Sequence, residues 1–101
     1  MNYHSNLESK ELDALFGAVL KLQNVEECYR FFADICSANE IKAIAQRLAV
    51  AKFLDDGLTY QEIVQKLGAS TATISRVNRS LHFGANGYHI VLRRLQNRDE
   101  E

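Results

Sequence analysis

Apolar side chains recur along most of the chain every three or four residues, the spacing that places them on one face of an α-helix. Residues 60–67 are typical, with apolar side chains at positions 60, 63, 64 and 67. No segment alternates apolar and polar residues over the length of a strand. We therefore predict an all-α protein. Its expected helices span about residues 6–23, 25–36, 38–56, 60–67, 71–82 and 87–97.

Capping residues mark the expected starts of several helices. In a capping box, a Ser or Thr accepts a hydrogen bond from the backbone three residues later, and a Glu at that position accepts one from the backbone of the cap. Pairs with this spacing are Ser5 and Glu8, Asn24 and Glu27 (with Asn as an analogue), Ser37 and Glu40, and Thr59 and Glu62. The chain has no proline, and four of its five glycines fall where we expect a helix to end: Gly57, Gly68, Gly84 and Gly87.

The most specific pattern is a helix-turn-helix in residues 59–82. Gly68 stands in its short turn, where a left-handed backbone is needed and only glycine adopts one without steric cost. Ile63 of the first helix has the spacing to meet Ile74 and Val77 of the second inside the crossing. The two helices should therefore form a fixed unit with a buried seam.

Opposite that seam, the helix at 71–82 carries small, hydroxylated and basic side chains. Small residues let a helix enter the major groove, hydroxyl groups bond base edges or phosphates, and arginine reads guanine or contacts the DNA backbone. We therefore expect double-stranded DNA as the partner. The predicted DNA-binding residues of this segment are Ser70, Thr71, Ala72, Thr73, Ser75, Arg76 and Arg79.

The distribution of charge agrees with this expectation although the net charge is only −1. Residues 57–98 contain six basic residues and one acidic residue, a local charge of +5, whereas residues 1–56 carry −3 and the last three residues −3. Affinity for DNA depends on where cations are placed more than on net charge. The basic end of the chain is the end that holds the helix-turn-helix.

Length and composition fit one globular domain, residues 1–101. A hydrophobic content of 47% argues against disorder, and no run reaches the length of a membrane span. The polar start is no signal peptide, so we expect a cytoplasmic protein. Cys28 and Cys36 lack the spacing of zinc ligands and should be reduced, buried thiols, so no metal site is expected.

The first two predicted helices are apolar over more than one stripe, since Leu20 and Phe31 lie off their main faces. A helix on the surface of a monomer needs only one apolar stripe. We therefore expect a homodimer whose core these helices share. The alternative is burial within a single chain.

Residues 38–81, ANEIKAIAQRLAVAKFLDDGLTYQEIVQKLGASTATISRVNRSL, resemble the tryptophan repressor family, and most closely its small YerC/YecD-type members. In the strongest segment, LGASTATISRVNRSL, the elements L-G-A, A-T-I-[ST]-R and S-L stand in the repressor's register. The resemblance implies a six-helix Trp repressor-like fold and an intertwined homodimer. The helix-turn-helix would project from the shared core as the DNA reader.

The resemblance also implies an effector pocket, in which two arginines of the repressor enclose the indole ring of tryptophan. Arg47 and Arg76 occupy the matching places, and Ser37 and Ser80 match a threonine and a serine of that pocket. Where the repressor has glycine after its second arginine, this chain has Val77, whose side chain would intrude on the ligand. We therefore do not expect tryptophan as the effector, and the small molecule, if one is sensed, stays open.

On the DNA side, Gln61 and Val64 stand where the first reader helix of the repressor presents arginine and lysine, so the target sequence should differ. We include Gln61 among the DNA-binding residues. Thr73 matches a threonine that faces DNA in the family, and Ala72 an alanine.

These observations lead to the hypothesis of a homodimeric, sequence-specific transcription regulator. The resemblance to the tryptophan repressor family implies that it is a repressor. The alternative is a protein-interaction module that keeps the helix-turn-helix without an operator. The DNA-binding domain of a replication initiator is disfavoured because the chain has no P-loop. We expect no enzyme and no catalytic residue, because no nucleophile stands with a base and neither His82 nor His89 has an obvious partner.

Overall fold

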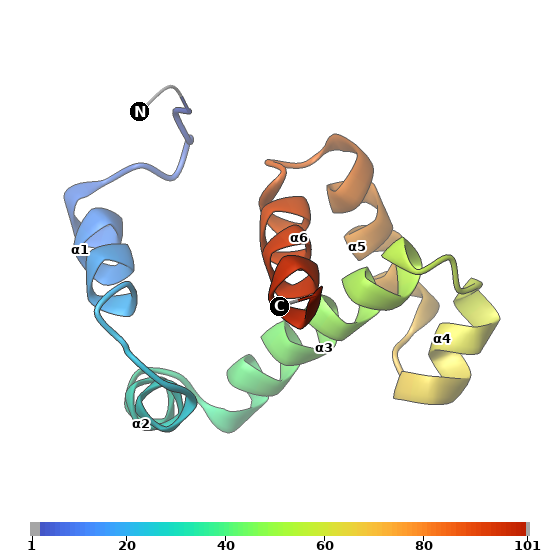
Figure 1. Cartoon of the computed structure of the whole chain (residues 1–101), viewed down its shortest axis with the longest axis horizontal. Coiled ribbons are helices and arrows are strands. Elements are labelled where there is room, and N and C mark those ends of the chain that lie inside the picture. The colour runs from blue at the N-terminus through green and yellow to red at the C-terminus, as the bar shows by residue number, and fades with distance from the viewer. Residues whose placement is uncertain (1–2, 101) are drawn as a thin grey trace. The chain divides into compact units, whose positions relative to one another are not determined.

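The computed structural model describes residues 3–100, and their side chains up to residue 97. Within this range there is no strand, so the prediction of an all-α protein is confirmed. The six helices are α1 (Lys10–Val19), α2 (Val25–Ile35), α3 (Ala38–Asp55), α4 (Tyr60–Leu67), α5 (Thr71–Phe83) and α6 (Gly87–Glu100), as Figure 1 shows. They form two compact units, Met1–Ala38 with α1 and α2, and Asn39–Glu101 with most of α3 and the remaining helices.

In the first unit, α1 is shorter than the predicted helix at 6–23. It begins after Ser9, whose hydroxyl accepts a hydrogen bond from the backbone N–H of Leu12 at 3.1 Å. The predicted start at Ser5 is wrong, because that hydroxyl accepts from the backbone of Leu7 in a local turn. Both Ser5 and Ser9 are residue types that cap helices, and Ser9, which is closer to the apolar repeat, is the N-cap of α1.

The predicted start of α2 is confirmed. Asn24 accepts a hydrogen bond from the backbone N–H of Glu27 at 2.9 Å, and the Glu27 carboxylate accepts one from Gln23 rather than from the cap itself. Neither α1 nor α2 contains a buried residue. Cys28 is exposed and Cys36 half-buried, so the expectation of two buried thiols is wrong for Cys28.

The second unit contains the hydrophobic core. All four of its helices and the turn before α5 contribute side chains, and α5 packs against both α4 and α6. The buried residues are Val50, Ala51, Ile63, Ala69, Ile74, Val77 and Leu92. This confirms the seam that the sequence predicted between Ile63 on one side and Ile74 and Val77 on the other.

The helix-turn-helix has the caps that its sequence predicts. The Thr59 hydroxyl accepts from the backbone of Glu62 at 3.2 Å, while the Glu62 carboxylate accepts from the backbone of Thr59 at 3.0 Å. The pKa of the Glu62 carboxylate is lowered first by its hydrogen bond from the backbone N–H of Thr59 and then by its interaction with the Thr59 hydroxyl. At the other end of α4, Gly68 adopts the left-handed conformation, with φ of 68°, and its N–H donates to the carbonyl of Val64.

The glycines near α6 differ from the prediction. Gly84 does follow the end of α5, but its backbone is extended, with φ of −87°. Gly87 begins α6, as the predicted helix at 87–97 does, and so does not mark a helix end. The left-handed residue of this connection is Asn86, with φ of 70°. Asparagine is among the residues that tolerate this conformation best, so the glycine was not needed there.

We predict that Gly68→Ala lowers the free energy of unfolding by about 1–2 kcal/mol, because alanine in the left-handed region places its Cβ against the following carbonyl. No neighbouring atom lies within 4 Å of that Cβ, so the loss would come from the backbone alone. Gly87→Ala is the control, since Gly87 has no positive φ and equally open surroundings. It should keep stability or raise it by up to about 1 kcal/mol. Equal effects of the two substitutions in urea unfolding would contradict this account of the turn.

A second prediction concerns the capping box. Because folding lowers the pKa of Glu62, the charged carboxylate stabilises the folded chain above its ordinary value of 4.5, and this contribution is lost as the pH falls through the lower folded value. Urea unfolding from about pH 7 to pH 3 should therefore show wild type more stable than Glu62→Gln at neutral pH, with the difference shrinking in acid. In a Thr59→Ala background the difference should be smaller throughout. A difference that is constant with pH would show that the charge plays no part.

Candidate DNA-binding surface

The outer face of α5 is fixed by the burial of its inner face. Ile74 and Val77 are buried, with Val77 only 2% exposed. Residues on the opposite side of the helix are therefore directed to solvent. The predicted DNA-binding residues on that side are all exposed: Ala72, Ser75, Arg76 and Arg79. The structure thus presents a small, hydroxylated and cationic surface on a rigid helix.

The start of α5 is organised by its cap. The Ser70 hydroxyl accepts from the backbone N–H of Thr73 at 3.1 Å and donates to the hydroxyl of Thr73 at 3.0 Å. Thr73 is half-buried, whereas Thr71 and Ala72 are exposed. Ser70 and Thr73 therefore hold the helix end together, and Thr71 is the hydroxyl at this end that is free to meet a partner. A DNA contact of Thr73 stays a prediction.

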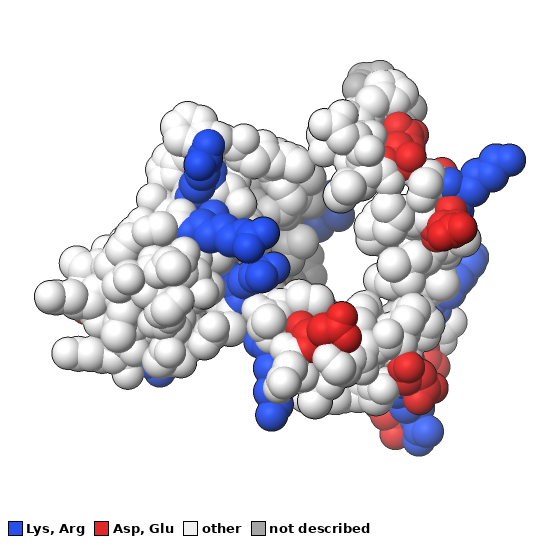
Figure 2. All heavy atoms as spheres, turned by 180° about the vertical axis from the view of Figure 1, so that it is seen from behind, with Lys and Arg blue, Asp and Glu red and all other residues white. Residues whose placement is uncertain are grey.

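Basic side chains gather on one face of the second unit. Seen from behind, blue Lys and Arg side chains lie over the middle of this unit, and few acidic side chains accompany them (Figure 2). The first turn of α5 contains no acidic residue. An anion approaching the start of α5 would thus meet the positive end of the helix dipole, with no carboxylate in the first turn of that helix.

A hollow of about 370 Å³ lies where α4 meets the start of α5. Its lining brings together two of the predicted DNA-binding residues, Gln61 and Thr71. It also contains Gln65, which the sequence reasoning missed. Gln65 stands four residues after Gln61, on the same face of the helix, and this spacing was a signal that could have found it. The full lining is Tyr60, Gln61, Val64, Gln65 and Thr71.

A larger cavity, of about 610 Å³, lies between α3, the end of α5 and the start of α6. Arg47 and Ser80 of the predicted effector pocket line it. Arg76 and Val77 do not: Arg76 is exposed and Val77 belongs to the core, as the helix crossing predicted. Ser37 is part of the other unit. The remaining lining is Ile44, Leu48, Gly84, Ala85, Gly87, Tyr88 and Val91.

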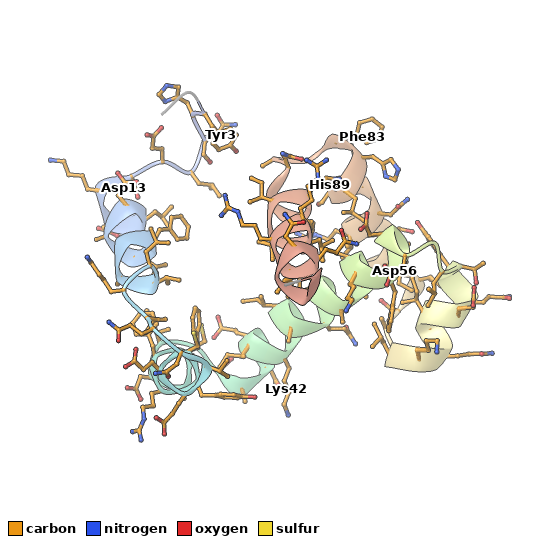
Figure 3. All side chains as sticks on the ribbon, in the orientation of Figure 1. Tyr3, Asp13, Lys42, Asp56, Phe83 and His89 are labelled. Atoms are coloured by element: carbon orange, nitrogen blue, oxygen red, sulfur yellow. The ribbon has the colours of Figure 1, made fainter. Side chains whose placement is uncertain are left out.

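His82 of α5 and His89 of α6 both bond to backbone carbonyls. His89, labelled in Figure 3, donates from Nε2 to the carbonyl of Leu81 at 2.8 Å and so ties α6 to α5. His82 donates from Nδ1 to the carbonyl of Asn78, also at 2.8 Å. Among the described side chains, no three of His, Cys, Asp or Glu converge as metal ligands would. No helix in the described part of the chain is long and apolar enough to cross a membrane.

The sequence and the fold of this chain are both similar to those of known proteins. The family model described as Trp repressor protein matches residues 10–96. YerC of Bacillus subtilis (strain 168), which is named an uncharacterized protein, is 52% identical over 95 residues, or 94% of this chain and 91% of YerC.

Two solved structures share the fold. A protein from Staphylococcus aureus is 53% identical and superposes with a TM-score of 0.86 over 89% of this chain and 90% of the other. A TrpR like protein from Eubacterium eligens ATCC 27750 is 50% identical, with a TM-score of 0.87 over 89% and 93% of the two chains. The Trp repressor-like fold is thereby confirmed, and the relationship points to a DNA-binding regulator. The chain belongs to the Trp repressor protein family.

Proposed function

We propose that this protein is a sequence-specific transcription regulator that binds double-stranded DNA as a homodimer and inserts α5 into the major groove. The observation that carries the proposal is the outer face of α5, where Ala72, Ser75, Arg76 and Arg79 are exposed on a helix whose inner face is buried. The major groove is about 12 Å wide and admits a helix of this kind. We place the protein in the cytoplasm.

Each class of side chain on this face suits a different part of the duplex. Ala72 lets the helix approach the base edges, and the hydroxyls of Thr71 and Ser75 bond bases or phosphates. Arg76 and Arg79, which lie three residues apart on one face, supply the charge that displaces counterions from the DNA backbone. The local charge of +5 in residues 57–98 supports such contacts.

The homodimer is supported by the first unit. It contains no buried residue in either helix, and several large apolar side chains are open to solvent, among them Leu20 at 83% and Tyr29 at 75% exposure. Apolar surface of this extent is stabilised by burial against another surface. A second copy of the chain would supply one, and it would also place two α5 helices on one duplex.

We propose that the protein acts by binding and carries out no catalytic step. His82 and His89, the histidines nearest the reading surface, are engaged with backbone carbonyls and not with a nucleophile. Arg47 and Ser80 could hold an anionic effector in the cavity beside α5. We do not expect tryptophan to be that effector.

Arg79→Ala should weaken binding to all DNA sequences about equally and reduce the slope of log affinity against log salt by about one. Electrophoretic mobility shifts at several salt concentrations, with fragments selected from random DNA, measure both effects. Arg30→Ala is the matched control, because Arg30 is an exposed arginine of α2 paired with Glu26 at 3.6 Å. Should wild type bind no fragment while remaining folded, the alternative of a protein-interaction module would replace the proposal.

For the homodimer, the expected signature is a melting temperature that rises with protein concentration, since folding and association of an obligate dimer are linked. Differential scanning fluorimetry over a hundredfold range of concentration would show the shift. Light scattering should give twice the mass of one chain. A stable monomer at micromolar concentration, with an unchanged melting temperature, would contradict the dimer.

A further inference from the structure

The hollow between α4 and the start of α5 is lined by uncharged side chains that carry amide, methyl and aromatic groups. Gln61 and Gln65 supply the amides, and Val64 and Thr71 supply methyl groups. The charged neighbours on α4, Glu62 and Lys66, do not line it. Glutamine and threonine can bond phosphates as well as bases, but an apolar side chain such as Val64 finds a partner only at the base edges, in the methyl group of thymine.

The two amides are arranged as a pair. Gln61 and Gln65 lie one helical turn apart on the same face of α4, and both are exposed. Within the described part of the chain, neither side-chain amide takes part in a hydrogen bond, so both their donors and their acceptors are available. Thr71 is the first residue of α5, so the amides stand beside the end of the helix that would enter the groove.

The chemistry of these groups matches one kind of base pair. A glutamine amide bonds adenine in the major groove through two contacts, accepting from N6 and donating to N7, and methyl groups pack against the C5-methyl of thymine. Guanine presents two acceptors at these positions, so the amide oxygen would face an oxygen there. The hollow therefore contains the groups for an adenine and, beside them, those for its thymine.

We propose that α4 reads an A·T base pair in each half-site. Gln61 and Gln65 share its adenine, one amide oxygen accepting from N6 and the N–H of the other amide donating to N7, and Val64 and Thr71 pack against the methyl of thymine. This inference rests on the proposed function, because it requires the helix-turn-helix to lie in the major groove. It adds a specificity element outside α5. It also gives a reason for Gln61 and Val64, the uncharged residues that stand where the tryptophan repressor has arginine and lysine.

The test is selection of bound fragments from random DNA, followed by affinity measurements in which each base pair of the preferred site is exchanged between A·T and G·C. We expect one A·T pair per half-site whose exchange weakens wild type by about 5- to 150-fold, the range of a good bidentate contact. In Gln61→Ala or Gln65→Ala, the ratio of the affinities for A·T and G·C at that pair should fall toward one. The preferences at the base pairs under α5 should persist. Gln96→Ala, an exposed glutamine of α6, is the control and should leave every ratio unchanged.

A second readout separates the methyl groups from the amides. Replacing thymine by uracil at the same pair removes only the C5-methyl. This should weaken binding by wild type more than binding by Val64→Ala, in which only Thr71 is left to contact the methyl. Circular dichroism of each variant checks that the helices are intact. If wild type binds specific DNA and all glutamine variants keep its full preference, this inference is wrong and the proposed function stands. If folded wild type binds no DNA, the proposed function fails and this inference fails with it.

Discussion

The burial of Ile63 against Ile74 and Val77 is the interaction on which the rest of this structure depends. These side chains lie in one core with Val50 and Ala51 of α3, so neither helix of the pair can rotate without exposing them. Because successive residues of a helix are about 100° apart, fixing the inner face of α5 also fixes its outer face. Removal of a buried branched side chain at this crossing would cost about 1–5 kcal/mol and loosen the surface that we propose meets DNA.

The turn completes this constraint. Gly68 ends α4 in the left-handed conformation, Ala69 is buried in the core, and Ser70 caps α5. Three consecutive residues thus have separate tasks: one changes the direction of the chain, one anchors the turn, and one starts the next helix. The position of the proposed DNA-binding surface is therefore set by contacts within the turn itself. Neither α1 nor α2 of the first unit contains a buried residue, so their apolar side chains would need a partner surface to be buried.

The sequence predicted the helix-turn-helix well because its signals there are local. The bounds Tyr60–Leu67, the capping box at Thr59 and the left-handed Gly68 all follow from spacing over a few residues. Prediction failed where two local signals competed, as at Ser5 and Ser9, and where a residue other than glycine took the left-handed position, as at Asn86.

The candidate sites were harder to predict because they join residues of different helices. The register of α5 showed that Val77 belongs to the core, but only the packing of α3, α5 and α6 shows that Arg47 and Ser80 share a cavity without Arg76. In the same way, the hollow at the start of α5 combines Gln65 with Thr71 across the turn. The spacing of residues along one helix shows which side chains share a face. Which of them line a common cavity depends on how the helices pack against each other.

If the α4–α5 surface is the part of the molecule that meets DNA, adding a selected duplex should change the amide chemical shifts of that surface in the isotope-labelled protein. We expect the largest changes in residues 60–80, around Thr71, Ser75 and Arg79, and we expect added salt to reverse them. Changes confined to α1 and α2, or none under conditions where the chain is folded, would contradict this expectation.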